Sequence, residues 1–443
     1  MTKEGGELRL SYIFTFWVPL AATWLMMSVE GPLIAAIIAR LPEAKNNLAA
    51  YGVAFSFALI VEAPIIMMMS ASTALVHDGE GYRKLRNFLQ VMNLGITSAM
   101  IILLIPDVFY WLIQDVVGLP PEVTRLTHIA VLLLLPWPGA IGYRRFYQGI
   151  LIRNNLTKRV AYGTVLRLAA ILGTSFSLFY LTELNGAAVG AISLSTAVIV
   201  ESIATRIMAH STIKRLRETP AVAGSESERM TYGSITSFYY PLALTSLLAL
   251  GVHPMVTFFI GQSRMALESL AVLPVITSLV FIFRSMGLSF NEVGIALMGE
   301  RFEGFRKLRT FTALLASAVV VVLGVIAFTP LEEVWFVHVS GLTQELAALA
   351  STPLQILVII PGFSVLLSFQ RSVLVNVRRT KYITLATGIE VGTIILILFV
   401  AITQFNAIGV VAAAVAFILG RFAANAYLML PVTKAVKERL HSI

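Results

Sequence analysis

The sequence predicts an all-α, polytopic membrane protein whose twelve transmembrane helices form two parallel six-helix repeats. The chain of 443 residues is 57% hydrophobic and only 13% charged, and its mean hydropathy is +0.83. A soluble domain with a polar surface does not sustain this composition. In addition, YRKLRNF at Tyr82–Phe88 has a near copy, FRKLRTF, at Phe305–Phe311, 223 positions further on. The copy indicates two equivalent halves.

Apolar stretches long enough to cross a bilayer recur along the whole chain. A helix of roughly 20 apolar residues spans the ~30 Å hydrocarbon core. The first stretch contains two prolines and lacks a small-residue cleavage site, so we expect a retained span rather than a signal peptide. The expected spans are 11–39, 48–76, 87–113, 124–151, 160–182, 187–210, 235–260, 267–292, 310–328, 347–370, 382–403 and 407–430.

Further matches extend the repeat over nearly the whole chain. FTFWVPLA (Phe14–Ala21) matches TSFYYPLA (Thr236–Ala243) at an offset of 222, and later matches follow at 223. Each half holds an even number of spans, so both enter the membrane in the same direction and are related by an axis along the membrane normal. We expect an N-terminal lobe at 1–212, a cytoplasmic linker rich in charge, Ser and Gly at 213–234, and a C-terminal lobe at 235–443.

Basic residues concentrate in every second loop. Short cytoplasmic loops carry the excess of Lys and Arg, so both termini are expected on the cytoplasmic side of a plasma or inner membrane. The net charge of +9 follows this distribution, which suits membrane lipids as partners and not nucleic acid; a dedicated lipid site is the less favoured alternative. The basic positions include Arg83, Lys84, Arg86, Lys214, Arg215, Arg217, Arg306, Lys307, Arg309, Lys434, Lys437 and Arg439.

Several motifs carry a resemblance to a known family. The six-plus-six layout, F-x-x-P-L-A in spans 1 and 7, and the basic loops after spans 2 and 8 resemble the MATE-like multidrug, oligosaccharidyl-lipid and polysaccharide exporter superfamily. FWVPLA, AAYGVAFS (Ala49–Ser56) and FYYPLAL are most similar to the progressive ankylosis protein group. The resemblance implies an alternating-access exporter, acting as a monomer and often driven by proton or sodium entry. The progressive ankylosis group is associated with efflux of small organic and phosphate-bearing anions.

Ionisable residues inside the expected spans carry the mechanistic argument. A charge at the bilayer centre costs at least ~2.5–3.5 kcal/mol on insertion scales, so each must meet a partner or a water-filled cavity. At the repeat offsets Glu62 matches Arg284, and Arg167 matches Glu390, so equivalent positions carry opposite charge. We expect these couples to form two ion pairs between the lobes, with pairing inside each lobe as the alternative.

A kink in span 1 predicts a coupling site. Glu30 lies just before Pro32, which removes a backbone donor and bends the helix. Exposed carbonyls beside an ionisable group suit H⁺ or Na⁺. Glu30 is therefore the preferred coupling residue and Glu62 the second, whereas His253 at the matching break is more commonly a packed polar group. Helix breaks are expected at Pro19, Pro32, Pro241 and Pro254.

Arginines inside the spans would make the cleft between the lobes electropositive. This suits an anionic substrate, because guanidinium forks bind phosphate and carboxylate through paired hydrogen bonds. Arg144 and Arg145 have an alternative, since they lie near enough to the end of span 4 for their charged heads to reach the membrane surface. The candidates for substrate contact or gating are Arg284, Arg167, Glu390, Arg421, Arg144, Arg145 and Glu201.

The favoured function is a secondary transporter, working by antiport, that exports a small organic or phosphate-bearing solute with no cofactor beyond coupling H⁺ or Na⁺. The chain lacks G-x-x-x-x-G-K-[ST], H-E-x-x-H and cysteine, so no ATP-driven pump, metal site or enzyme is expected. The alternatives are a flippase for a lipid-linked precursor, with Arg144 and Arg145 at a lateral portal, and a multidrug cation antiporter with aromatic residues such as Trp17 and Tyr239 in its pocket. A scaffold ranks last, because it needs no intramembrane charge.

Overall fold

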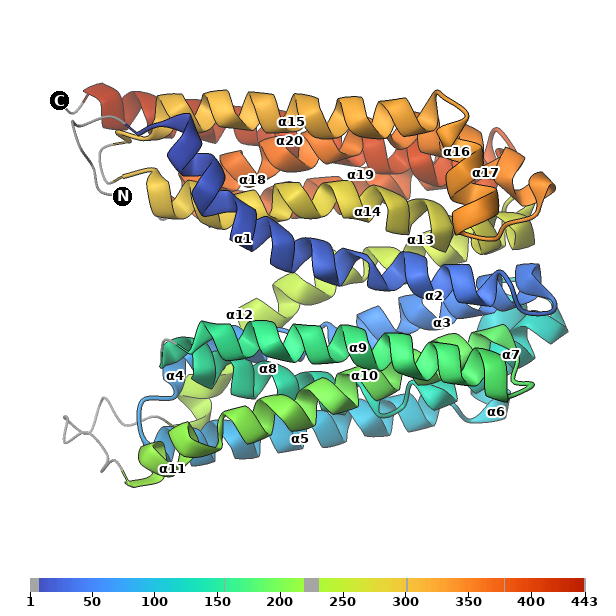
Figure 1. Cartoon of the computed structure of the whole chain (residues 1–443), viewed down its shortest axis with the longest axis horizontal. Coiled ribbons are helices and arrows are strands. Elements are labelled where there is room, and N and C mark those ends of the chain that lie inside the picture. Colours follow the sequence, from blue (N-terminus) through green and yellow to red (C-terminus); the bar gives the residue numbers. More distant parts are fainter. Residues whose placement is uncertain (1–7, 155, 219–230, 300–301, 378, 442–443) are drawn as a thin grey trace. The chain divides into compact units, whose positions relative to one another are not determined.

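The computed structural model describes residues 8–154, 156–218, 231–299, 302–377 and 379–441, which form helices joined by short connections (Figure 1). Those of the N-terminal half are α1 (Leu10–Ser28), α2 (Glu30–Ile38), α3 (Ala44–Glu62), α4 (Met68–Leu75), α5 (Gly79–Leu103), α6 (Pro106–Tyr110), the π-helix η1 (Trp111–Val116), α7 (Pro121–Leu133), α8 (Trp137–Arg153), α9 (Thr157–Leu181), α10 (Gly186–Met208) and α11 (His210–Glu218). Those of the C-terminal half are α12 (Tyr232–Leu250), α13 (Val252–Gly261), α14 (Ala266–Leu297), α15 (Phe305–Ala327), α16 (Leu331–Glu333), the π-helix η3 (Val334–Val339), α17 (Gln344–Leu357), α18 (Ile360–Asn376), α19 (Lys381–Thr403) and α20 (Gly409–His441).

In the described part of the chain, eleven helices or helix pairs are long and apolar enough to cross a membrane, and up to twelve if a pair bent by 76° at α5–α6 is one span. These segments coincide with the expected spans, which confirms the all-α membrane fold. Several helices run past the expected ends; α14 reaches Leu297 and α18 reaches Asn376. Hydropathy marks only the apolar part of a helix, whereas the hydrogen-bonded backbone continues beyond it.

Two of the four predicted helix breaks occur, in equivalent positions of the two halves. α1 ends at Ser28 and α12 ends at Leu250. These residues lie four positions before Pro32 and Pro254, each of which lacks the N–H that would bond to the carbonyl there. The breaks expected at Pro19 and Pro241 are wrong, because both positions lie inside continuous helices, Leu10–Ser28 and Tyr232–Leu250. Inside a membrane the remaining backbone groups must bond within the helix, which favours its continuation.

The described helices group into two compact units. The N-terminal unit is Leu41–Phe258, and the C-terminal unit is Met1–Arg40 together with Phe259–Ile443. The predicted lobes, 1–212 and 235–443, keep the first span of each half with its own half. The units instead place each of these spans with the other half. Of the predicted linker, residues 219–230 lie outside the described residues. The residues before them belong to α11, which packs on α5.

Trp17 on α1 attaches the first span to the C-terminal unit. Its Nε1 donates to Ser289 Oγ at 2.8 Å and to the carbonyl of Met286 at 3.3 Å, and its ring centroid lies 5.9 Å from that of Phe311. Helix α1 accordingly packs on α14 and α15 (Figure 1). This polar and aromatic attachment explains why span 1 joins the C-terminal unit.

Tyr239 on α12 attaches the seventh span to the N-terminal unit in the same way. Its hydroxyl donates to the carbonyl of Pro64 at 2.6 Å, and its ring centroid lies 5.4 Å from that of Phe88. Tyr239, Pro64 and Phe88 are the residues that the offsets of 222 and 223 pair with Trp17, Met286 and Phe311. The first span of each half thus packs in the unit formed mainly by the other half.

Small residues bring the central helices of each unit together. A Cβ on Gly149 of α8 would overlap Ser72 Oγ of α4, and a Cβ on Gly294 of α14 would overlap Ser372 Oγ of α18. The repeat offsets pair Ser72 with Gly294 and Gly149 with Ser372, so one contact recurs with its two residues exchanged. This recurrence, like the equivalent π-helices η1 and η3, supports the predicted repeat.

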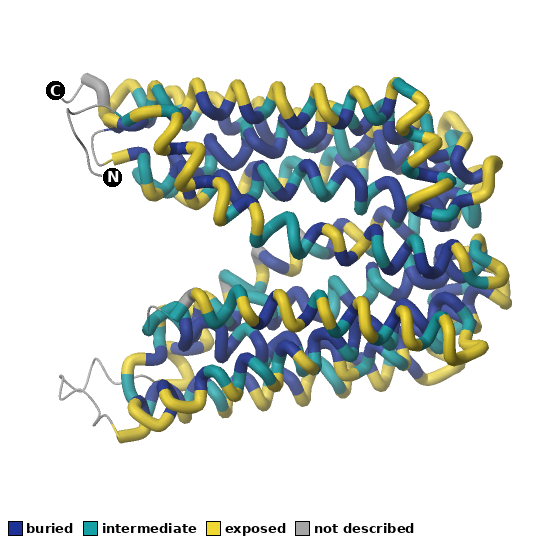
Figure 2. The backbone as a smooth tube through the Cα atoms, in the orientation of Figure 1, coloured by how far each residue is buried: buried dark blue, intermediate teal, exposed yellow. Residues whose placement is uncertain are grey.

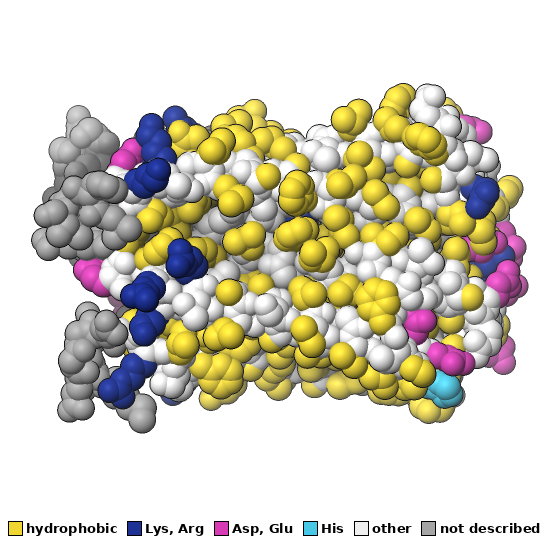
Figure 3. Space-filling model, turned by 90° about the horizontal axis from the view of Figure 1, so that it is seen from above, with side chains coloured by type: hydrophobic (Ala, Val, Ile, Leu, Met, Phe, Trp, Pro, Cys, Tyr) yellow, Lys and Arg dark blue, Asp and Glu magenta, His cyan; other side chains and the backbone are white. Residues whose placement is uncertain are grey.

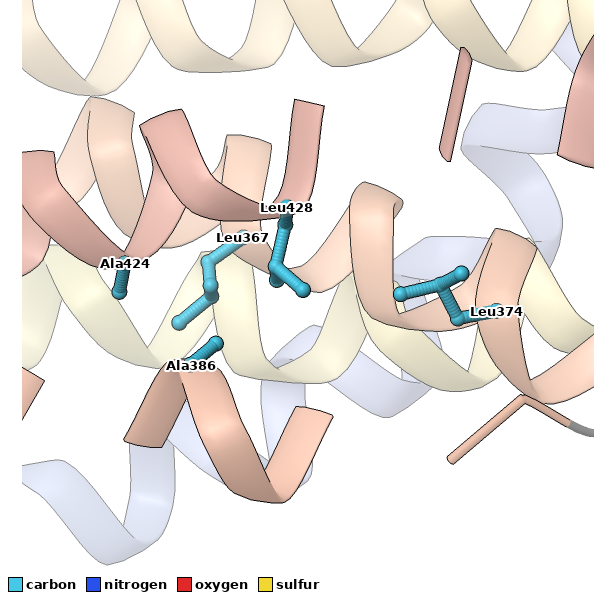
Figure 4. Packing of buried hydrophobic residues seen from close by; sticks show 5 residues of the cluster. All are labelled: Leu367, Leu374, Ala386, Ala424 and Leu428. Carbon is cyan, nitrogen blue, oxygen red and sulfur yellow. The ribbon is translucent and has the colours of Figure 1, made fainter. Parts of the chain in front are cut away.

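Burial is uneven among the spans (Figure 2). In α9 and α19, which are equivalent, only 22% and 17% of the apolar window is buried, against 61% for α10. α19 joins the C-terminal unit through a cluster of Leu367, Leu374, Ala386, Ala424 and Leu428 (Figure 4). On the face in Figure 3, Lys and Arg side chains gather at one end of the helices and Asp and Glu side chains at the other.

Candidate functional site

Glu201 on α10 is the centre of a buried charge cluster in the N-terminal unit. Arg144 Nη1 on α8 lies 2.6 Å from Glu201 Oε2, and the two side chains are 4% and 1% exposed. Gln148 Nε2, one turn further along α8, donates to Glu201 Oε1 at 3.1 Å. Arg167 Nη1 on α9 lies 3.8 Å from Glu201 Oε2. Both carboxylate oxygens therefore have a cationic or amide partner.

Backbone packing brings these side chains to Glu201. Gly163 lies one turn before Arg167 on α9, and a Cβ there would stand 3.5 Å from Glu201 Cγ, so α9 rests closely on α10. α8 continues to Arg153, which places Arg144 inside the helix and not at its end. For Arg144, the alternative that its charged head reaches the membrane surface is therefore wrong.

Glu62 forms a second acidic centre at the end of α3. Trp137 Nε1, on the first residue of α8, donates to Glu62 Oε2 at 2.6 Å. The Arg167 guanidinium carbon stands 5.9 Å from the Trp137 ring centroid, within cation–π range. Trp137 and Arg167 thus connect the two acidic centres of the unit. Arg145 is only partly buried and approaches Met69 Sδ at 3.8 Å.

The C-terminal unit holds a matching cluster with fewer acids. Glu390 Oε1 on α19 lies 2.8 Å from Arg421 Nη2 on α20, and Arg371 Nη2 on α18 donates to Thr387 Oγ1 at 3.3 Å. Arg284 on α14 lies in the electrostatic field of Glu390, Arg421 and Arg371. Among the described residues, Arg284 makes no hydrogen bond, and the Nε atoms of all three arginines are buried without an acceptor.

The two clusters occupy equivalent helices. The offsets pair Glu62 with Arg284, Gln148 with Arg371, and Arg167 with Glu390. The sequence did not point to Arg371, because the tenth span was expected to end at residue 370 while α18 runs to Asn376. Its pairing with Gln148, a polar residue at the equivalent place in span 4, was the available signal.

The contacts above join partners of the same unit. Glu390 pairs with Arg421, Arg167 approaches Glu201, and Glu62 accepts from Trp137. This is the pairing inside each lobe that the sequence left as the alternative. The two ion pairs between lobes stay a prediction.

Glu30 and His253 belong to helices that carry no residue of either cluster. Glu30 is the first residue of α2 and is 6% exposed; the next residue, Gly31, lets α2 approach α14, since a Cβ there would stand 3.1 Å from Ser278 Cβ. His253 is the second residue of α13 and is exposed. Within the described ranges, no group of three or more His, Asp or Glu residues is arranged to hold a metal ion.

The structure defines a class of protein, a helical membrane protein built of two units that each hold an arginine-rich charge cluster. No family model matches the chain, and no curated protein matches it. Solved structures do match. An inward-facing multidrug resistance MATE family transporter of the MOP superfamily gives a TM-score of 0.70 at 14% identity, over 94% of this chain and 96% of its own.

Two further structures have related folds. The lipid II flippase MurJ, in an inward closed conformation, gives a TM-score of 0.70 at 15% identity, over 96% of this chain and 90% of its own. A MOP superfamily transporter from Pyrococcus furiosus, reported with a binding pocket of reversed polarity, gives 0.64 at 16% identity, over 96% of each chain. The chain therefore has the fold of MATE and MOP superfamily transporters, and the predicted MATE-like fold is confirmed. The progressive ankylosis subgroup stays a prediction.

Proposed function

We propose that the chain is a secondary transporter that works by alternating access, exports a small organic or phosphate-bearing anion, and is coupled to H⁺ or Na⁺. The fold supports the transporter class, because structures with this fold include transporters and a flippase. The observation that carries the substrate class is the excess of arginine inside the units. In the C-terminal unit Glu390 pairs with Arg421, and the charges of Arg284 and Arg371 lie within electrostatic range of this pair.

This excess has a physical consequence. Each charge within a span costs at least ~2.5–3.5 kcal/mol on insertion scales unless it is compensated. Glu390 compensates one of three guanidinium groups, so the cluster retains positive charge that a phosphate or carboxylate would neutralise. Guanidinium groups suit such a ligand because they present paired donors in a fixed plane. A cationic drug would add to the repulsion, which makes the multidrug cation antiporter the less favoured function.

Glu62 is the carboxylate best suited to coupling in this scheme. Glu201 already has two arginines and an amide as partners. Glu62 has one partner, Trp137. Glu62 is the last residue of α3 and precedes the short connection to α4. Helix ends of this kind provide backbone carbonyls for a coupling ion. Glu30, which the sequence favoured over Glu62, becomes the second candidate.

The flippase is the second candidate function, and it has one specific observation in its favour. Arg145 is only partly buried and, among the described residues, its Nε has no acceptor. A lipid-linked phosphate needs a cationic contact of this kind that is not already paired. The chain would act as a monomer. Both termini would lie in the cytoplasm, because the basic residues concentrate in every second loop of the sequence.

Flux into proteoliposomes tests the proposal. Purified protein is reconstituted and supplied with labelled small organic and phosphate anions, a cationic dye and a labelled polyprenyl phosphate, with and without H⁺ and Na⁺ gradients. We expect gradient-dependent flux of at least one small anion and none of the dye. Movement of the polyprenyl phosphate alone would replace the exporter by the flippase, and flux of the dye alone would overturn the anionic class.

A further inference from the structure

In the N-terminal unit, three arginines that belong to neither charge cluster lie against a set of aromatic rings. We call Tyr82, Phe146 and Tyr147 the aromatic cluster; the ring centroids of Tyr82 and Phe146 lie 5.7 Å apart and those of Phe146 and Tyr147 lie 5.1 Å apart. Arg86 and Arg217 both lie over the Tyr82 ring, at 5.7 and 5.4 Å from its centroid. Arg206 lies over the Tyr147 ring at 5.3 Å.

Helix α11 brings Arg217 to this cluster. The chain turns at Ala209 after α10, and α11 buries Thr212, Ile213 and Leu216. It packs against the start of α5 at Gly79, where a Cβ would stand 3.0 Å from the Leu216 carbonyl oxygen and 3.2 Å from Arg217 Cα. The absence of a side chain at Gly79 therefore allows α11 to place a guanidinium over Tyr82.

No acidic partner of these three arginines lies in the described part of the chain. Among the described residues, Arg86, Arg206 and Arg217 form no ion pair, and Arg86 Nε is buried without an acceptor. The acid nearest in the chain to Tyr82, Glu80, lies 2.6 Å from Lys84 Nζ. Guanidinium groups held on one set of rings repel each other, so the arrangement favours a bound anion that accepts from them.

The aromatic cluster lies where two rows of exposed apolar side chains, one on α5 and one on α10, end. On α5 the exposed apolar side chains begin at Val91 and continue at Leu94, each 70% exposed. On α10 they include Ile203 and Ile207, at 56% and 68%. Arg86 precedes the first row by little more than a turn, and Arg206 lies within the end of the second. Side chains at such an edge meet the headgroup layer of a bilayer.

We propose that Arg86, Arg206 and Arg217, held on the aromatic cluster, bind the phosphate of an anionic phospholipid headgroup. Exposed basic residues of α11, among them Lys214, extend the cationic surface around it. The equivalent place in the other half differs. There Phe305 replaces Tyr82 and its ring contacts are Phe302 and Phe369, with no guanidinium over it among the described residues. The site therefore occurs in the N-terminal unit, and the matching arginine Arg309 serves as a control.

Lipid retention tests this site without reference to transport. The full-length protein is reconstituted in nanodiscs of phosphatidylcholine with one fifth phosphatidylglycerol, extracted, washed, and its retained lipids are counted by mass spectrometry. We expect the wild type to retain phosphatidylglycerol in preference to phosphatidylcholine. Arg86→Gln and Arg217→Gln each lower this preference by about fivefold, the effect of one basic residue near an anionic surface.

Three comparisons make the result decisive. Arg309→Gln removes the same charge at the equivalent position and should leave the preference within about twofold, whereas Arg86→Lys keeps the charge and should retain most of it. Equal losses in Arg86→Gln and Arg309→Gln, or no preference in the wild type, would overturn the site. Competition by millimolar inorganic phosphate as strong as that by the lipid would assign the site to free phosphate and also overturn the proposal. Thermal unfolding in phosphatidylcholine alone reports whether each variant is folded.

Discussion

Trp17 and Tyr239 occupy equivalent positions in the two halves and make the same two kinds of contact, each in the unit formed mainly by the other half. Trp17 donates to the carbonyl of Met286 and packs on Phe311. Tyr239 donates to the carbonyl of Pro64 and packs on Phe88. The contact thus recurs at positions that the predicted repeat pairs. It also accounts for the division into units, because the first span of each half is held by the other half.

The exchanged contacts should contribute to stability to a similar extent. Trp17→Phe removes the donor shared by Ser289 and Met286, Tyr239→Phe removes the donor to Pro64, and both keep a ring, so each should lower the free energy of unfolding by about 1 kcal/mol. The two residues share no partner, so the double variant should lose the sum. Tyr240→Phe is the control, because Tyr240 is 65% exposed. Thermal unfolding in detergent measures all four proteins, and a loss in Tyr240→Phe equal to that in Tyr239→Phe would contradict the assignment.

The buried pair of Arg144 and Glu201 should be sensitive to removal of one partner. Arg144→Gln leaves the Glu201 carboxylate with less compensation and should cost about 3–5 kcal/mol. Adding Glu201→Gln to that variant should recover part of the loss, since an amide pair needs no counter-charge. The exposed pair of Lys84 and Glu80, at 28% and 37% side-chain exposure, is the comparison, and Glu80→Gln should cost less than about 1 kcal/mol. A double variant less stable than Arg144→Gln would argue against a paired charge.

Glycine substitutions should separate close helix packing from helix propensity. Gly149→Ala and Gly294→Ala introduce a Cβ that overlaps Ser72 and Ser372, so both should destabilise by about 1–3 kcal/mol. Gly95 on α5 has no atom within 4 Å of a built Cβ. Gly95→Ala should therefore be neutral or stabilise by up to about 1 kcal/mol. Unfolding midpoints compare the three variants, and similar shifts in all of them would count against the packing role.

Glu62 should be needed for coupling and not for substrate binding. Glu62→Gln keeps an acceptor for Trp137 Nε1 but removes the titratable group. Exchange of labelled substrate without an ion gradient should persist, while the acceleration by an H⁺ or Na⁺ gradient should be lost. Glu122→Gln, at an exposed position in the first turn of α7, should behave as the wild type. Retention of full gradient dependence in Glu62→Gln would transfer the role to Glu30.

Much of the architecture follows from the sequence because apolar length and repeat spacing are local properties. The twelve stretches were predicted from them, whereas the breaks before Pro32 and Pro254 were predicted from the prolines, and the MATE-like fold from the resemblance of the motifs to that superfamily. The break predicted at Pro19 is wrong, because the loss of one backbone donor does not end a helix whose other backbone groups must bond within it. Trp17 was assigned to the N-terminal lobe, because chain order does not reveal which bundle a span joins.

The candidate site was predictable in its residues and not in its partners. The cost of placing a charge in the membrane marked Arg144, Arg167, Glu201, Glu390 and Arg421, and all of them have partners of opposite charge. Trp137 and Gln148 were missed, because an indole and an amide carry no charge to draw attention. Hydropathy also ended span 10 before Arg371. Only the three-dimensional contacts join Glu201 to Arg144, since these residues are far apart in the chain.

Anion flux through a variant of the C-terminal cluster tests the central claim most directly. Arg371→Gln removes one cationic group of the cluster around Glu390, and Arg306→Gln removes one from the exposed start of α15. Uptake of the transported anion into proteoliposomes is measured at matched reconstitution levels. The account predicts at least a tenfold loss of kcat/KM in Arg371→Gln, equivalent to ~1.4 kcal/mol, and less than a twofold change in Arg306→Gln. Equal flux in both variants and the wild type would contradict a substrate site built on the arginines of the C-terminal cluster.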